Sequence, residues 1–129
     1  MIDTHRPTDP SVTELSSFHL SQHADELRES SAYQSSGKSS RALVKSPGLS
    51  MVLMALAEGA ELKEHHAPGP ATAVVLEGEI LFSRIDRSGD SRQEQVLSRH
   101  ECVAFSADLR HAVRAQKESL LLVTIGCKS

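Results

Sequence analysis

The chain is poor in aromatic side chains and in clustered positive charge. Its 129 residues include no Trp, one Tyr and three Phe, and its formal net charge is −3 with seven histidines counted as neutral. Lysines and arginines are spread along the chain, so no basic patch of the kind that binds a phosphate backbone is visible. Few side chains are available for base stacking. These absences argue against nucleic acid as a partner.

Long apolar runs and cysteines are also scarce. No stretch approaches the roughly 20 apolar residues of a membrane span, and the first residues lack the apolar run of a signal peptide. We therefore expect no membrane association and a cytoplasmic location. Cys102 and Cys127 are expected to be reduced residues of the core or of a strand edge. A chain of this length builds a sufficient hydrophobic core without disulfides.

Two segments precede the main body of the chain. Residues 1–20 are rich in Ser, Thr, Pro and Asp, which predicts an irregular N-terminal arm. Ser21 is the predicted N-cap of a short helix at residues 21–30, which a Ser-rich segment broken by Gly37 is expected to end. Residues 21–129 are predicted to form a single domain.

Short β-type runs separated by turn residues fill the rest of the chain. A turn signal recurs about every 8 to 12 residues, which is typical of an all-β sandwich or barrel. No helical pattern lies between the runs, which excludes a parallel α/β sheet. The predicted strands are 41–45, 49–57, 71–76, 80–85, 93–97, 102–105, 111–115 and 120–125.

The most informative stretch is rich in histidine. Glu64, His65 and His66 open a predicted hairpin, and His111 reaches the same place only through folding. Imidazoles gathered from separate strands suit a pocket that holds a divalent metal. The other four histidines have no companions at ligand spacing and are expected to be solvated: His5, His19, His23 and His100.

These features resemble a small single-domain cupin of the type-2, RmlC-like jelly-roll superfamily. Gly59, His65, Pro68-Gly69 and the run 76–79 match the first cupin motif. The resemblance covers about residues 40–126. It implies an all-β fold, a cupin-like double-stranded β-helix or jelly-roll barrel, here preceded by a short N-terminal helix.

The second cupin motif is present in weaker form. Residues 97–101 take the place of its first turn, and residues 106–111 take the place of its second turn and final histidine. His100 is one of several larger residues that stand where the family has glycines and prolines. These turns are therefore expected to be less tight than in the family.

The resemblance also locates the expected metal ligands. Counting back from Gly78, Ala71 stands where the family has its metal-binding Glu, and Ala67 stands where it has a second His. In this register only His65 and His111 of four expected ligands are present. The glycine itself predicts a turn with positive φ or close packing.

A shift of one residue would change the donor set. Glu64 and His66 would then face inward, because successive side chains of a strand point to opposite sides. His65, His66 and His111 are the candidate metal ligands, and three imidazoles would suit one divalent transition metal: Zn, Fe, Ni, Cu or Mn. This alternative is a metal-dependent oxygenase, isomerase or decarboxylase that acts on a small organic acid or sugar derivative.

The leading hypothesis is a small-molecule-binding cupin with a histidine-lined barrel pocket and no assignable reaction. Its predicted pocket residues are Glu64, His65, Arg110 and His111, of which Arg110 would contact an anionic ligand at the barrel mouth. In this hypothesis the pocket residues bind the ligand without a metal ion.

A third interpretation is a scaffold domain without a pocket. Large side chains would then fill the barrel, namely Met51, Met54, Phe82 and Phe105. The nearly continuous apolar run 49–57 indicates that both faces of that strand are covered, one by the barrel interior and the other by the N-terminal helix or by a second subunit. The resemblance implies a homodimer.

Overall fold

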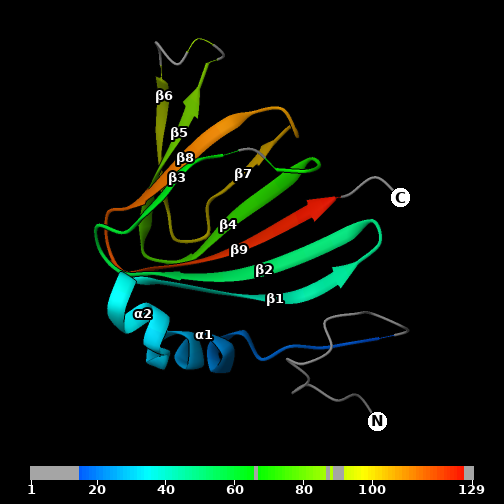
Figure 1. Cartoon of the computed structure of the whole chain (residues 1–129), viewed down its shortest axis with the longest axis vertical. Helices are drawn as coiled ribbons and strands as arrows, with labels where there is room; N and C mark the ends of the chain where they lie inside the picture. Colours follow the sequence, from blue (N-terminus) through cyan, green and yellow to red (C-terminus); the bar gives the residue numbers. More distant parts are fainter. Residues whose placement is uncertain (1–14, 66, 87, 89–91, 127–129) are drawn as a thin grey trace.

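Two antiparallel sheets pack face to face, with two helices beneath the larger sheet (Figure 1). The computed structural model describes residues 15–65, 67–86, 88 and 92–126, without the side chains of residues 64 and 65. The larger sheet has the strand order β1-β2-β9-β4-β7, and the smaller has the order β3-β8-β5-β6. The elements are α1 (Leu20–Glu29), α2 (Ser31–Ser36), β1 (Lys38–Ser46), β2 (Leu49–Leu56), β3 (Glu61–His65), β4 (Ala71–Glu77), β5 (Glu79–Ile85), β6 (Arg92–Ser98), β7 (Cys102–Phe105), β8 (Arg110–Ala115) and β9 (Ser119–Gly126).

The all-β prediction is confirmed, and the structure adds the strand β3 to the predicted set. It pairs antiparallel with β8, so that Leu62 lies opposite Val113 and His65 lies opposite His111. The register shifts between Leu62 and His65, as it does at a β-bulge. Only Leu62 is apolar among the five residues of β3, so the alternation typical of a half-buried strand is not visible in its sequence.

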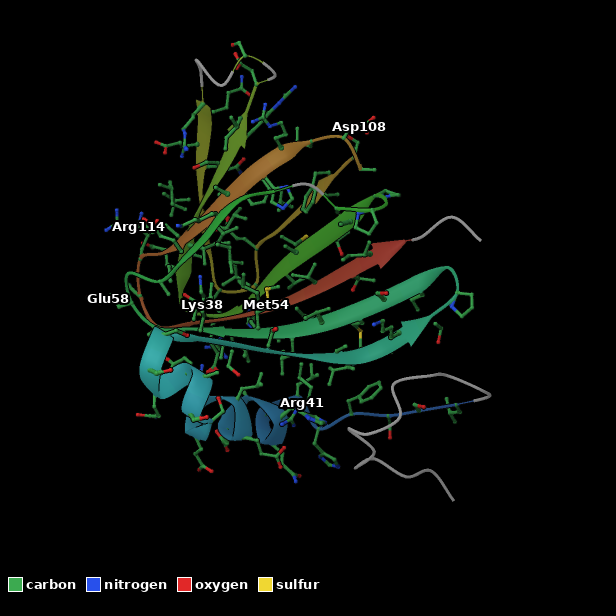
Figure 2. All side chains as sticks on the ribbon, viewed as in Figure 1. Lys38, Arg41, Met54, Glu58, Asp108 and Arg114 are labelled. Carbon is green, nitrogen blue, oxygen red and sulfur yellow. The ribbon has the colours of Figure 1, made fainter. Side chains whose placement is uncertain are left out.

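Alternation along the strands sorts side chains between the barrel interior and the outer faces. On β4, Ala71, Ala73 and Val75 are buried, whereas Thr72 between them is exposed. Figure 2 shows Met54 on the side of β2 that faces the other sheet. On β4 the interior is therefore lined by every second residue.

The interior is packed most densely at the end of the barrel near α2. There the fully buried side chains come from both sheets, and none is more than 2% exposed: Leu56, Val75, Ile80, Leu97 and Leu121. Burial of a leucine, isoleucine or valine side chain contributes roughly 1.5–3 kcal/mol. This cluster therefore closes one end of the barrel and holds the two sheets together.

The N-terminal helix lies one residue earlier than predicted. α1 follows His19, which contributes no side-chain cap, so Ser21 is a residue of the first turn and not the N-cap. Its inward face consists of His23, Ala24 and Leu27. The expectation that His23 is solvated is wrong, because only 6% of the residue is exposed.

Arg41 on β1 ties this helix to the larger sheet. Its Nη1 donates to Nδ1 of His23 at 2.9 Å and contacts Oε1 of Glu26 at 2.6 Å. The guanidinium holds the pKa of the Glu26 carboxyl below its usual value, mainly through this hydrogen bond. Figure 2 shows Arg41 on the side of β1 that faces the helices.

The Ser-rich segment contains a second short helix, which the sequence pattern does not reveal. Ser30 ends α1 and begins α2: its hydroxyl donates to the Leu27 carbonyl at 2.6 Å and accepts from the backbone N–H of Tyr33 at 3.3 Å. Gly37 ends α2 with a φ of 78°. A serine after a helical segment predicts the end of that helix. Ser30 does end α1, but it is also the N-cap of α2, which the sequence pattern alone does not distinguish.

The second face of β2 is covered by α1. Leu53 and Ala55 are 0% exposed and pack in one cluster with Ala24 and Leu27 of the helix. Met51 also packs against this cluster and not inside the barrel. The helix therefore covers this face, and the homodimer stays a prediction. None of the described helices is long and apolar enough to cross a membrane.

The turn between β6 and β7 is a four-residue turn closed by a backbone hydrogen bond. The Glu101 N–H donates to the Ser98 carbonyl at 2.9 Å, and the His100 N–H donates to the Val75 carbonyl at 2.7 Å. His100 adopts a φ of 73°, the left-handed conformation that glycine favours. His100 therefore adopts the backbone conformation of a turn glycine although it has a side chain. His100 and His19 are exposed, as expected.

Gly78 occupies a turn that leaves no room for a side chain. Its φ is 85°, and a Cβ built there would lie 2.8 Å from the Cα of Ser119 and closer still to the Glu118 carbonyl oxygen and the Ser119 hydroxyl. Ser119 is 0% exposed and hydrogen-bonds both the N–H and the carbonyl of Glu79. The turn between β4 and β5 thus packs directly on the start of β9.

We expect Gly78→Ala to lower the free energy of unfolding more than Gly59→Ala. Both glycines have a φ near 85°, but a Cβ at Gly59 meets nothing within 4 Å. The left-handed backbone alone costs about 1–2 kcal/mol, which is the loss expected for Gly59→Ala. The backbone clash should bring Gly78→Ala to about 3 kcal/mol or more. Urea unfolding of both variants measures the difference, and equal losses would contradict the packing described here.

Candidate functional site

A cavity of about 200 Å³ lies between the two sheets, next to the dense cluster, whose Leu121 forms part of its wall. We call this cavity the chamber. The described residues of its wall are apolar except for one imidazole. The lining residues are Met54, Leu62, Ala67, Pro68, Ala71, Ala73, Phe82, Phe105, His111, Val113, Leu121, Val123 and Ile125.

The chamber exists because β4 carries small residues where it lines the cavity. Its inward positions are Ala71, Ala73 and Val75, and the two alanines line the chamber while the valine belongs to the dense cluster. Met54, Phe82 and Phe105 stand on the chamber wall without filling it. A methyl group reaches less far into the barrel than the leucine and isoleucine side chains of the closed end. The barrel is therefore not the filled scaffold of the third interpretation.

Among the described residues that line the chamber, His111 is the polar one. It is 4% exposed, and its Nδ1 lies 3.1 Å from the carbonyl oxygen of Leu109. Because a carbonyl only accepts hydrogen bonds, Nδ1 must carry the proton, which in the neutral ring leaves the lone pair on Nε2. The ring stacks on Phe82 with 5.5 Å between centroids and meets Phe105 at 4.5 Å. The imidazole is thus fixed in both tautomer and orientation.

A second cavity, which we call the mouth, adjoins the chamber. It has a volume of about 350 Å³ and shares Phe82 and Phe105 with the chamber. Whereas the chamber is apolar, the mouth carries polar side chains from β5, β6 and the segment after β7. These are Arg84, Gln93, Gln95 and Ser106.

The sequence interpretation missed the residues of the mouth. Arg84 lies opposite His111 in the β5–β8 pairing, so both belong to the inward face of the smaller sheet. The available signal was the alternation of Ile80, Phe82 and Arg84 along one predicted strand. An arginine near the end of a strand is usually interpreted as a solvated residue. The alternation therefore did not indicate a binding role for Arg84.

The predicted site residues are only partly described. His111 lines the chamber, and His65 lies opposite it in the backbone register. Arg110 is half-buried at the start of β8, on the face opposite to that of His111. Glu64 is a residue of β3, while His66 lies outside the described residues, so the roles of Glu64, His65 and His66 stay predictions.

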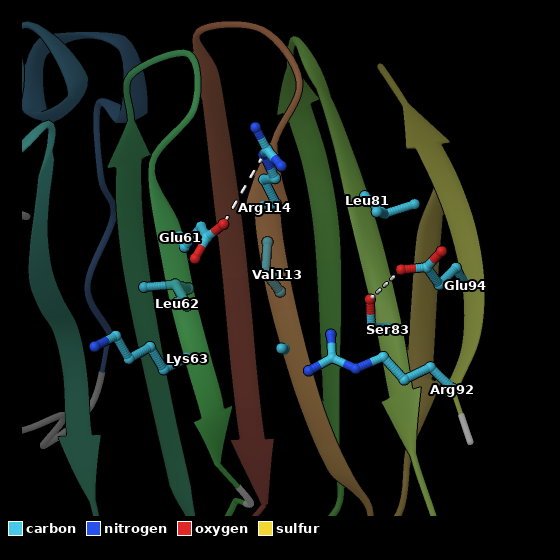
Figure 3. A pocket seen from close by; sticks show the side chains of 10 residues that line it. Glu61, Leu62, Lys63, Leu81, Ser83, Arg92, Glu94, Val113 and Arg114 are labelled. Carbon is cyan, nitrogen blue, oxygen red and sulfur yellow. Dashed lines mark hydrogen bonds and ion pairs between the residues drawn. The ribbon is translucent and has the colours of Figure 1, made fainter. Parts of the chain in front are cut away.

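The outer face of the smaller sheet carries a separate depression of about 400 Å³ (Figure 3). It contains one ion pair, in which Arg114 Nε lies 4.0 Å from Glu61 Oε1, and one hydrogen bond, which the Ser83 hydroxyl donates to Glu94 at 3.3 Å. Its described lining is mostly charged and polar. The chamber, whose described lining is almost entirely apolar, is therefore the better candidate for a binding site.

Solved structures of similar fold are cupins. A cupin superfamily protein from Desulfitobacterium hafniense has a TM-score of 0.63 at 21% identity, over 70% of this chain and 78% of that chain. A cupin 2 conserved barrel domain protein from Leptotrichia buccalis has a TM-score of 0.61 at 30% identity, over 69% of this chain and 40% of that chain. The chain has the cupin fold, as the sequence resemblance predicts.

Enzymes are also among the similar structures. Oxalate decarboxylase of Bacillus subtilis, a protein with Mn(II) centres, has a TM-score of 0.63 at 20% identity, over 72% of this chain and 26% of that chain. A likeness at this identity shows the fold and carries no chemistry with it. A scan against protein-family models and a search of curated proteins each returned no match.

The described side chains do not form a metal site. Ala67 and Ala71, the positions at which the cupin motif has ligands, both line the chamber and offer only methyl groups. Among the described residues, no three His, Cys, Asp or Glu side chains lie close enough together to hold a metal ion. Zinc and similar metals need three or four protein ligands. The three-histidine site of His65, His66 and His111 stays a prediction.

We expect the purified, untagged protein to contain far less than one transition metal ion per chain. The described wall of the chamber offers one imidazole, and one imidazole does not retain a metal against dilution. Inductively coupled plasma mass spectrometry of the wild type, His111→Ala and His66→Ala measures this content. Near-stoichiometric Zn, Fe, Ni, Cu or Mn that falls in both variants would establish the three-histidine site instead.

Proposed function

We propose that this protein binds a small molecule inside its cupin barrel, in the chamber. The observation that carries the proposal is the apolar cavity beside Ala71 and Ala73, with the imidazole of His111 held in its wall. Ligand sites are commonly concave and mostly apolar, with few polar groups that fix orientation. The chamber meets this description, and no reaction is assigned to it.

The size of the chamber limits the apolar body of the ligand. An apolar cavity of about 150 Å³ holds a benzene molecule, so the 200 Å³ of the chamber suits one ring with a few further atoms. Phe82, Phe105 and His111 present three rings to such a ligand. Planar groups gain from stacking and edge contacts with these rings.

A metal-dependent enzyme is the second candidate. The observation that favours it is the antiparallel pairing of β3 with β8, which sets the backbone of His65 opposite that of His111. The hydrogen bond from His111 Nδ1 to a backbone carbonyl is also the arrangement common for metal-binding histidines. The metal analysis above distinguishes this candidate from the leading one.

Toluene should bind in the chamber and lose affinity when the chamber is filled. We expect a dissociation constant of about 1 mM or lower for the wild type, measured by ligand-observed NMR. Ala73→Leu places three more carbon atoms in the cavity and should weaken binding about tenfold or more. Ala73→Val fills less space and serves if the leucine variant does not fold.

Ala32→Leu is the matched control, because Ala32 is exposed on α2. It should bind toluene as the wild type does. Either absence of saturable binding to the wild type or equal binding to Ala73→Leu would overturn the proposed function.

A further inference from the structure

We infer that the ligand of the chamber carries a carboxylate, which Arg84 binds in the mouth while the apolar body of the ligand lies in the chamber. This inference rests on the proposed function and goes beyond it by naming the chemical class of the ligand. It follows from the adjacency of two cavities of opposite character. They share the rings of Phe82 and Phe105 as a common wall.

The strand register places Arg84, an exposed residue, in the mouth, two residues after the Phe82 ring that both cavities share. Along β5, Ile80 belongs to the dense cluster, Phe82 lines both cavities and Arg84 lines the mouth. Across the sheet, Arg84 is paired with His111, which lines the chamber. Paired residues of adjacent antiparallel strands lie about 4.5–5.5 Å apart. A short molecule can therefore reach from the chamber wall to the guanidinium.

The guanidinium of Arg84 has no partner within the described part of the chain. It forms no hydrogen bond or ion pair with another described residue, and no Asp or Glu is among the described residues that line the mouth. Arg110, the arginine that the sequence favours, already interacts with another residue and lies on the opposite face of its strand. Arg84 is thus the cation available to a ligand in this cavity.

Two amides accompany this charge. Gln93 lies opposite Arg84 and Gln95 lies opposite Phe82 in the β5–β6 pairing, and both line the mouth. Glutamine amides donate hydrogen bonds without adding charge. The described lining of the mouth therefore combines one positive charge with several neutral donors.

A carboxylate fits this set better than a phosphate. The planar fork of a guanidinium donates two parallel hydrogen bonds to the two oxygens of a carboxylate. One cation balances the single negative charge of a carboxylate, whereas a phosphate carries up to two. An apolar body attached to the carboxylate would enter the chamber, which offers no second cation among its described residues.

Phenylacetate tests the inference, because it is toluene with one carboxylate added. The affinities of the full-length protein for phenylacetate, phenylacetamide and toluene are measured by ligand-observed NMR. Phenylacetate should bind about tenfold more tightly than phenylacetamide, as a charge-assisted hydrogen bond requires. Arg84→Gln should abolish this preference while toluene binds as before.

Arg110→Gln is the matched control and should keep the preference for phenylacetate. If toluene binds but phenylacetate gains nothing over phenylacetamide, or if Arg84→Gln leaves the preference intact, the inference is wrong and the proposed function stands. A preference lost in Arg110→Gln and kept in Arg84→Gln would assign the anion to the other arginine. If neither toluene nor phenylacetate binds, the proposed function itself fails.

Discussion

The contrast between large and small side chains along the inward face of β4 determines what this barrel can do. Val75 belongs to the dense cluster of leucines and an isoleucine, which is almost fully buried and holds the two sheets together. Two and four residues earlier, Ala73 and Ala71 face the same interior with methyl groups. Packing at one end thus supplies the stability that allows the other end to stay hollow. The chamber therefore results from the change from a large to small inward side chains along β4.

The same alternation separates two kinds of charge on the smaller sheet. Arg84 shares the inward face with Phe82 and reaches the mouth of the cavity. The neighbouring outer face carries charges such as Arg114 and Glu61, which pair with each other in solvent. Exposed pairs of this kind contribute little to stability. A single cation beside an apolar cavity, in contrast, would favour anionic ligands under the proposed function.

Much of this architecture is predictable from the sequence. The strand pattern and the first cupin motif predict the barrel, and Gly78 has the positive φ expected of it. β3 escapes prediction because it is mostly charged, and the helix α2 because Ser30 caps one helix where another ends.

The site was predicted only in part, through His111 and through the alanines that replace family ligands. The wall of the chamber depends on pairings between distant strands, such as that of Phe82 with Val113, which local sequence does not encode. The account depends most directly on where a small apolar molecule binds. Intermolecular nuclear Overhauser effects from toluene to alanine methyl groups locate it, and the account predicts contacts with Ala71 and Ala73. Contacts with Ala112 on the outer face in their place would contradict it.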